Sequence, residues 1–255
     1  MGALDGKVAV VTGSTSGIGR AIASTFAKNG AHVVVSGRRS DRGKAVAEEI
    51  RRAGGSALFH QTDVAVPGDC RAVIERAAKE FGGVDILVNN AGIFPRAEIE
   101  DTTPELWDEI FNVNLRGAFF CCQAAIPLMK GRGGGTIINI GSGHPFTGYT
   151  ALTAYGISKG ALYTMTRRMA IGLARDRIRV NWITVGWVLT EKELEVQAGE
   201  GKDVAALEKI RESLPMGQMS TEADIADACL YLAGPSGERV TGTDILASAG
   251  MTIHL

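Results

Sequence analysis

Short apolar runs rich in β-branched residues alternate with longer amphipathic segments along almost the whole chain. The apolar runs lie at residues 8–11, 32–36, 57–61, 86–89, 136–140, 180–184 and 244–247. Between them, apolar residues recur with the period of a helix at 18–29, 42–53, 70–81, 104–129, 155–174 and 222–232. Near-continuous apolar strands separated by helices are typical of a parallel sheet covered on both faces. With right-handed crossovers, this alternation predicts an α/β fold, a doubly wound, Rossmann-like parallel sheet of about seven strands.

The length of the chain and its even composition predict one domain over residues 1–255. A chain of 255 residues is long enough for a single large core, and no Pro/Ser-rich tract or internal repeat divides it. Residues 191–215 are the exception to the alternation, because this polar, Glu/Lys-rich stretch is too long for a simple connection. We expect a substrate-binding flap there, although a solvated helical excursion would have the same composition.

Charge and composition exclude several classes of partner. A net charge of -1 gives no electrostatic case for nucleic acid or an anionic membrane, and the apolar stretch 117–129 is too short to span a bilayer. The four cysteines have no C-x-x-C spacing and are interpreted as free thiols, and the N-terminus lacks the apolar region of a signal peptide. The four histidines form no ligand spacing. We therefore expect a cytoplasmic protein with no metal, nucleic acid or membrane.

A glycine-rich turn follows the first apolar run and leads directly into the first helical segment. Glycines at a strand-to-helix turn let the backbone approach a pyrophosphate, and the helix N-terminus offers unpaired N–H groups. The spacing G-x-x-x-G-x-G differs from the commoner G-x-G-x-x-G, but the context predicts nucleotide binding. The residues of the turn are Gly13, Ser14, Thr15, Ser16, Gly17, Ile18 and Gly19.

The second apolar run ends in Gly37, Arg38 and Arg39, where an NAD-binding domain usually carries an acidic residue for the ribose hydroxyls. Guanidinium groups match the oxygens of a phosphate. The two arginines therefore favour NADP(H), with NAD(H) as the alternative if they are solvated loop residues.

Tyr155 and Lys159 are four residues apart on a predicted helix, so their side chains leave the same face. A tyrosine with its ordinary pKa of about 10 exchanges protons poorly at neutral pH, and a nearby ammonium lowers that pKa. The pair is a candidate acid/base device. By spacing alone, an ordinary half-buried tyrosine beside a solvated lysine is the alternative.

Several motifs in the same order make the chain resemble the short-chain dehydrogenase/reductase family, of the kind that includes β-ketoacyl carrier protein reductases, over essentially its whole length. The glycine turn matches the family's cofactor motif, and residues 89–92, Asn-Asn-Ala-Gly, match the motif that closes the fourth strand. Tyr155 and Lys159 match its Y-x-x-x-K pair, Ser142 its serine thirteen residues earlier, and Asn114 its helix asparagine.

The resemblance implies a role for each of these four residues. Tyr155 protonates a carbonyl oxygen or takes the proton of an alcohol, and Ser142 binds that oxygen. Lys159 lowers the pKa of Tyr155 and holds the cofactor ribose, and Asn114 holds a water that links Lys159 to solvent. Further cofactor contacts are implied at Asp63, Val64, Asn90, Ala91, Gly92, Gly186, Val188 and Thr190.

Some of these positions have a second interpretation. Asp63 is suited equally to capping the following helix. Val185 stands before Gly186 where relatives usually have proline, and the segment 247–250 departs from their Asp-Gly-Gly. We expect His144, Phe146 and Trp187 to line the substrate pocket with Ser142 and Tyr155.

Together these features predict an NADP(H)-dependent oxidoreductase that interconverts a small carbonyl compound and a secondary alcohol. Relatives are commonly homotetramers built through the long helices, here 104–129 and 155–174, so the resemblance implies one. A catalytically silent nucleotide-binding scaffold or sensor is the alternative, and an enzyme of the same fold that dehydrates or epimerises is a third.

Overall fold

The computed structural model describes residues 2–199, 201 and 204–252, and its centre is one parallel sheet. Its strands are β1 (Val8–Val11), β2 (His32–Gly37), β3 (Ser56–Gln61), β4 (Ile86–Asn89), β5 (Gly135–Ile140), β6 (Ile178–Val185) and β7 (Asp244–Ala247). They lie in the order β3-β2-β1-β4-β5-β6-β7, and every neighbouring pair is parallel. The predicted seven-stranded, Rossmann-like fold is confirmed, with strand ends within two residues of expectation.

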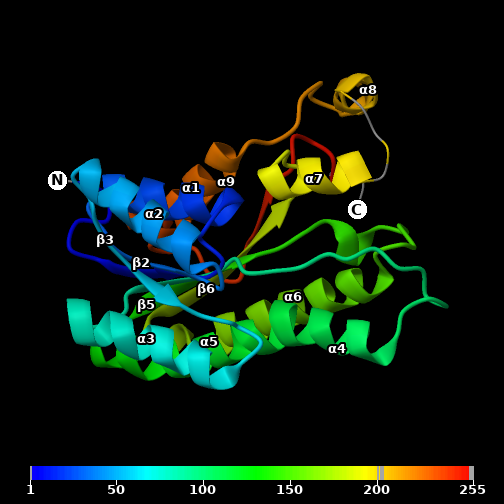
Figure 1. Cartoon of the computed structure of the whole chain (residues 1–255). Coiled ribbons are helices and arrows are strands. Elements are labelled where there is room, and N and C mark those ends of the chain that lie inside the picture. The colour runs from blue at the N-terminus through cyan, green and yellow to red at the C-terminus, as the bar shows by residue number, and fades with distance from the viewer. Residues whose placement is uncertain (1, 200, 202–203, 253–255) are drawn as a thin grey trace.

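Helices cover both faces of this sheet (Figure 1). One face carries α1 (Gly17–Lys28), α2 (Ser40–Arg52) and α9 (Glu222–Ala233). The other carries α3 (Pro67–Phe81), α4 (Pro104–Phe111), α5 (Gly117–Gly131) and α6 (Thr153–Gly172). The order of the strands reverses between β1 and β4, so loops from both halves meet at their carboxyl ends, which is where ligands bind in such sheets.

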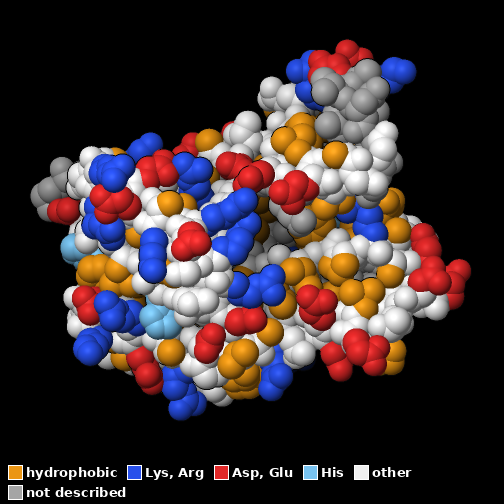
Figure 2. All heavy atoms as spheres, viewed as in Figure 1, with side chains coloured by type: hydrophobic (Ala, Val, Ile, Leu, Met, Phe, Trp, Pro, Cys, Tyr) orange, Lys and Arg blue, Asp and Glu red, His pale blue; other side chains and the backbone are white. Residues whose placement is uncertain are grey.

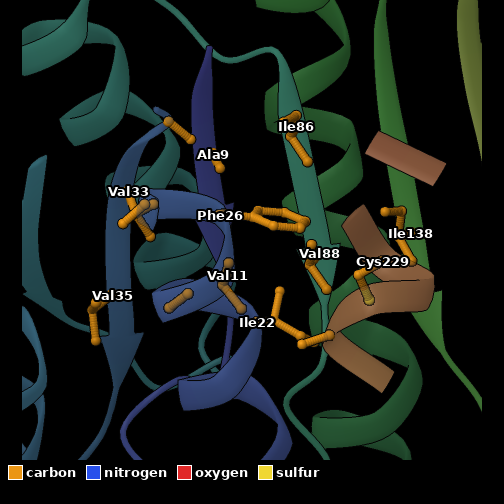
Figure 3. Packing of buried hydrophobic residues seen from close by; sticks show 14 of the residues in the cluster. Ala9, Val11, Ile22, Phe26, Val33, Val35, Ile86, Val88, Ile138 and Cys229 are labelled. Carbon is orange, nitrogen blue, oxygen red and sulfur yellow. The ribbon is translucent and has the colours of Figure 1, made fainter. Parts of the chain in front are cut away.

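Buried apolar side chains fill both layers between helices and sheet. Figure 3 shows Ile22 and Phe26 of α1 against Val11 of β1 and Val88 of β4, and all four are fully buried. The opposite layer contains Cys70, Cys121, Cys122 and Met129, among others. All four cysteines of the chain are buried and free, as their sequence contexts predicted.

The predicted helix 104–129 is interrupted by one turn of π-helix, η1, at Asn112–Arg116. This wider turn separates α4 from α5 and contains Asn114, whose side chain is buried. Hydrophobic periodicity cannot reveal an insertion of this kind, because the pattern on either side stays helical.

The segment predicted as a flap forms two helices, α7 (Glu191–Gly199) and α8 (Val204–Ser213), which stand beside the body of the molecule (Figure 1). Residues 200, 202 and 203 of that segment lie outside the described residues. Short 3-10 turns lie at η2 (His144–Phe146), η3 (Ala174–Asp176) and η4 (Pro235–Gly237). In the described part of the chain, no helix has both the length and the apolar character to cross a membrane.

Candidate active site

The structure gathers the four predicted catalytic residues from three elements beyond the carboxyl ends of β4 and β5. Tyr155 and Lys159 lie in the first two turns of α6, Ser142 follows β5, and Asn114 lies in η1. Ser142 lies close enough to Tyr155 for its hydroxyl to lower the pKa of the phenol. A Cβ placed on Gly92 would lie 3.4 Å from Asn114 Oδ1 and 3.6 Å from Lys159 Nζ, so these two polar atoms face the same backbone position.

Asn114 is held by three hydrogen bonds. Its Oδ1 accepts from the Ile93 N–H at 2.8 Å, and its Nδ2 donates to the Ile93 carbonyl at 2.9 Å and to Ser158 Oγ at 3.1 Å. Ser158 in turn donates to the Tyr155 carbonyl at 2.7 Å. Ser158 therefore ties η1 to α6. Sequence reasoning missed it, although it lies directly before Lys159.

The pKa of Tyr155 is raised to about 12, chiefly because the phenol is buried. The hydrogen bond from Ser142 lowers it, and the negative charge of Glu193 adds to the rise. Lys159 does not offset this rise in the present arrangement, and its lowering of the Tyr155 pKa stays a prediction. Lys159 Nζ donates to the Ile140 carbonyl at 2.8 Å and lies 5.9 Å from the centre of the Tyr155 ring. Tyr155 is consequently protonated at neutral pH.

Burial also shifts Lys159, lowering the pKa of its ammonium to about 8. Its side chain is 4% exposed. At neutral pH the ammonium form of Lys159 still predominates, so the site holds a buried cation beside a protonated phenol.

The glycine turn has the geometry of a phosphate cradle. Gly13 and Gly17 have φ of +65° and +57°, in the left-handed region that side chains disfavour. A Cβ on Gly19 would lie 2.5 Å from the Gly13 carbonyl oxygen. Ser16 is the N-cap of α1 but makes no side-chain cap, and the first turn of α1 contains no acidic residue. The leading N–H groups of α1 are therefore suited to an anion.

Two side chains fix the shape of this turn. Thr12 Oγ1 accepts from the N–H groups of Asn90 and Ala91, at 3.0 and 3.1 Å. Asn90 Nδ2 donates to the carbonyls of Thr12 and Gly13, at 2.9 and 3.1 Å. The motif after β4 is therefore hydrogen-bonded to the motif after β1, and Thr12, which begins the turn, holds the two together.

The predicted arginines lie next to the turn. Arg39 Nη2 donates to Ser16 Oγ at 2.7 Å and to Thr15 Oγ1 at 3.3 Å, and Arg38 is exposed beside it. A Cβ at position 37 would lie 2.8 Å from Thr15 Cγ2, so a side chain there would require Thr15 to move. Figure 2 shows basic side chains gathered beside a hollow below the α7–α8 segment.

The remaining predicted cofactor contacts lie along the same edge. Asp63 Oδ1 accepts from the Ala65 N–H at 3.0 Å, closing a tight turn, while α3 begins after Val66 with Pro67, so Asp63 does not cap that helix. Val64 is buried directly after it.

The loop after β6 is held against both neighbouring segments. A Cβ on Gly186 would lie 2.7 Å from Ser248 Cα, and Val188 forms a bridge with Ser220. A Cβ on Gly17 would lie 3.5 Å from Thr190 Cγ2, which places Thr190 next to the glycine turn.

The predicted pocket residues fall in different places. The centres of the His144 and Tyr155 rings are 5.7 Å apart, and the backbone N–H of His144 donates to Ser142 Oγ at 3.2 Å. Phe146 packs on Tyr163, about two turns of α6 beyond Tyr155, so its place in the pocket stays a prediction. Trp187 Nε1 donates to Glu193 Oε1 at 2.9 Å, which fixes the indole against α7.

Two charged residues of the site were missed. Glu193 of α7 is nearly buried and acts on Tyr155, and Arg96 lies 3.7 Å from it. The signal for Arg96 was its place as the first charged residue after the apolar run at β4. Among the described residues, which leave out His254, no group of three or more His, Cys, Asp and Glu side chains is arranged to hold a metal.

Comparison with known proteins agrees with this geometry. Residues 13–252 match a family model described as enoyl-(acyl carrier protein) reductase. The D-beta-hydroxybutyrate dehydrogenase of Rhizobium meliloti is 38% identical over 96% of this chain and 98% of its own length. The NADP-dependent (R)-specific alcohol dehydrogenase of Lentilactobacillus kefiri is 37% identical, covering 98% of each.

Solved structures agree as well. A 7α-hydroxysteroid dehydrogenase in complex with NADH and 7-oxo glycochenodeoxycholic acid superimposes with a TM-score of 0.92 at 34% identity, covering 97% of this chain and 95% of that one. The family model covers most of the chain, and the relatives align over nearly all of it. The chain therefore belongs to the short-chain dehydrogenase/reductase family of oxidoreductases.

Proposed function

We propose that this protein is an NADP(H)-dependent oxidoreductase that interconverts a small carbonyl compound and a secondary alcohol, with Tyr155 as general acid/base. The observation that carries this proposal is the half-buried, protonated Tyr155, which lies beside Ser142 and one helical turn from the buried Lys159. A scaffold or sensor would have no need of a phenol and an ammonium kept at the cost of burial.

Each residue of the site has a separate role in the proposed reduction. Tyr155 donates its proton to the carbonyl oxygen as negative charge develops there, and the Ser142 hydroxyl hydrogen-bonds the same oxygen. Lys159 stabilises the phenolate that Tyr155 leaves behind, while Asn114, facing the same position as Lys159, holds the path by which the proton is replaced. When bound, the nicotinamide supplies the hydride.

A preference for NADP(H) is supported by Arg39 over the glycine turn, Arg38 beside it and glycine in place of an acidic residue at position 37. A 2′-phosphate would take the place of water around these guanidinium groups. One relative is named as NADP-dependent, whereas one structural neighbour was solved with NADH, so NAD(H) is the alternative.

The cofactor-binding edge would run from the glycine turn through Asp63, Val64, Asn90, Ala91 and Gly92 to Gly186, Val188 and Thr190. We assign His144 and Trp187 to the substrate side and residues 191–215 to a flap over it, within one domain of 1–255.

A homotetramer is supported by a groove of about 400 Å³ on the outer face of η1, α5 and α6, lined by Phe111, Asn112, Leu115, Arg116, Phe119 and Met165. Four buried, free cysteines support a reducing compartment, the cytoplasm.

Replacement of Tyr155 tests the roles. Tyr155→Phe removes the proton and keeps the ring, so we expect kcat to fall by about 10²–10⁴-fold. NADPH affinity, measured by fluorescence titration, should change little. Tyr231→Phe, on the exposed face of α9, is the matched control and should behave as wild type. Turnover retained by Tyr155→Phe would refute the assigned role.

A further inference from the structure

The charged pair at the substrate side has no part in the proton transfer described above. Arg96 lies in the loop after β4 and Glu193 in α7, and Arg96 Nη2 is 3.7 Å from Glu193 Oε1. The side chains are 24% and 12% exposed. Charged groups that are largely removed from solvent cost free energy of desolvation unless they are paired or bind a ligand. The position of this pair beside the reacting groups therefore requires a functional explanation.

The loop that carries Arg96 is fixed beside the reacting groups. Two residues before it, the Phe94 ring lies 6.2 Å from the Tyr155 ring. One residue after it, Ala97 donates to the Ala151 carbonyl at 2.9 Å and pairs with Leu152, close before Tyr155. Arg96 is thereby fixed at the rim of the space that Tyr155 faces.

The fields of both charges reach that space. Burial and the positive charge of Arg96 lower the pKa of His144, whose ring lies against Tyr155, while Glu193 acts on Tyr155 itself. Arg96, Glu193, His144 and Tyr155 therefore form one cluster. At neutral pH its His144 is uncharged and able to exchange a hydrogen bond with a ligand.

Glu193 is held independently of Arg96. Its Oε1 accepts from Trp187 Nε1 at 2.9 Å and from Gln197 Nε2 at 2.5 Å, donors that belong to its own segment. These two donors use both lone pairs of Glu193 Oε1. Arg96 Nη2, 3.7 Å away, is close enough for an ion pair but too far for a hydrogen bond. Glu193 would remain hydrogen-bonded if Arg96 turned to another anion.

From these contacts we infer that Arg96 is a specificity-determining residue that binds a carboxylate of the substrate, which makes oxo acids and hydroxy acids the substrate class. The guanidinium fork matches a carboxylate with two parallel hydrogen bonds. Glu193 takes the place of that carboxylate when no substrate is bound and competes with it. This inference rests on the proposed carbonyl reduction and names the substrate class of that site.

The test compares short-chain oxo acids, with the carbonyl one, two or three bonds from the carboxyl group, with their methyl esters. The ratio of kcat/KM between each acid and its ester isolates recognition of the charge. We expect wild type to prefer one of the acids and Arg96→Gln to lower that ratio by about 10- to 100-fold, chiefly through KM. Arg96→Lys keeps the charge without the fork and should fall between them.

Two further variants separate recognition from structure. Glu193→Gln retains an acceptor for Trp187 but removes the competing charge, so KM for the acid should fall while KM for the ester stays. Arg71→Gln, exposed on α3 and outside the site, is the matched control and should leave the ratio unchanged.

The contrary outcomes are distinct. If Arg96→Gln and Glu193→Gln lower kcat/KM equally for acid and ester, the pair only holds the loop and the flap together. A wild-type enzyme with no preference for the acids would also overturn the inference. Turnover of esters alone would leave the proposed reductase standing. Turnover of neither, with either coenzyme, would refute the reductase and this inference with it.

Discussion

At the scale of single residues, burial decides the chemistry more than proximity does. The sequence motif identifies Tyr155 and Lys159, and their spacing correctly predicts that they share a face. It cannot predict the direction of the tyrosine's pKa shift, because that depends on how far the folded chain removes the phenol from solvent and on charges such as Glu193 from other segments. With a pKa of about 12, Tyr155 holds its proton over the whole physiological range. The free enzyme therefore holds the protonated phenol, the form that carbonyl reduction requires, while the raised pKa makes this phenol a weaker acid than an ordinary tyrosine.

The same burial makes Lys159 a source of instability. The pKa of its ammonium is about 8 in the folded protein and about 10.4 in an unfolded chain, so folding disfavours the charged form. The penalty is fully present below pH 8 and is lost as the pH rises towards 10.4, where both states are neutral.

Lys159→Met should therefore raise the free energy of unfolding by about 1–3 kcal/mol at pH 7, after allowance for the lost bond to Ile140, and should abolish turnover. Urea denaturation at pH 7 and pH 10 checks the sign, since the gain should shrink at the higher pH. Lys44→Met, exposed on α2, is the control and should show no gain at either pH. A destabilised Lys159→Met at pH 7 would contradict the account.

At the scale of elements, the strands and most helices can be predicted directly from the hydrophobic pattern. A parallel strand that is buried on both faces appears in the sequence as an apolar run, and the amphipathic helices appear as longer segments between these runs. The π-turn at η1 and the separation of α7 from α8 do not follow from it. Arg96, Glu193 and Ser158 were missed for a related reason: each also contacts or acts on an element distant in the chain, and the sequence does not reveal that pairing.

The glycine turn provides an element-scale prediction. Gly13→Ala places a side chain at φ +65° with its Cβ 2.8 Å from Ala91 Cα. Gly54→Ala imposes a similar positive φ, +85°, with no neighbour within 4 Å, at the opposite edge of the sheet. Both should lose about 1–2 kcal/mol of stability from backbone strain.

Only Gly13→Ala should also weaken NADPH binding, by about tenfold or more, because the clamp between the turn and Ala91 must shift. Isothermal titration of NADPH against each variant makes the comparison. Equal affinities for the two variants would show that the turn does not bind the cofactor.

At the scale of the whole molecule, the exposed apolar face at η1, α5 and α6 leads us to expect that copies of the chain assemble through it. Phe119 is 49% exposed beside the groove formed by η1, α5 and α6. Wild type should have a mass of about four times 26.9 kDa by light scattering, and Phe119→Glu should give smaller species. A monomeric wild type would contradict the proposed homotetramer.

Carbonyl reduction with NADPH can be measured in a single steady-state comparison of the two coenzymes with the wild-type enzyme. Coenzyme oxidation is followed with NADPH and with NADH against a panel of ketones, oxo acids and their esters. We expect turnover of at least one carbonyl compound, with kcat/KM for NADPH about tenfold or more above that for NADH, because Arg38 and Arg39 bind the additional phosphate. A preference for NADH would contradict the assignment of the two arginines, and no turnover with either coenzyme would contradict the enzyme itself.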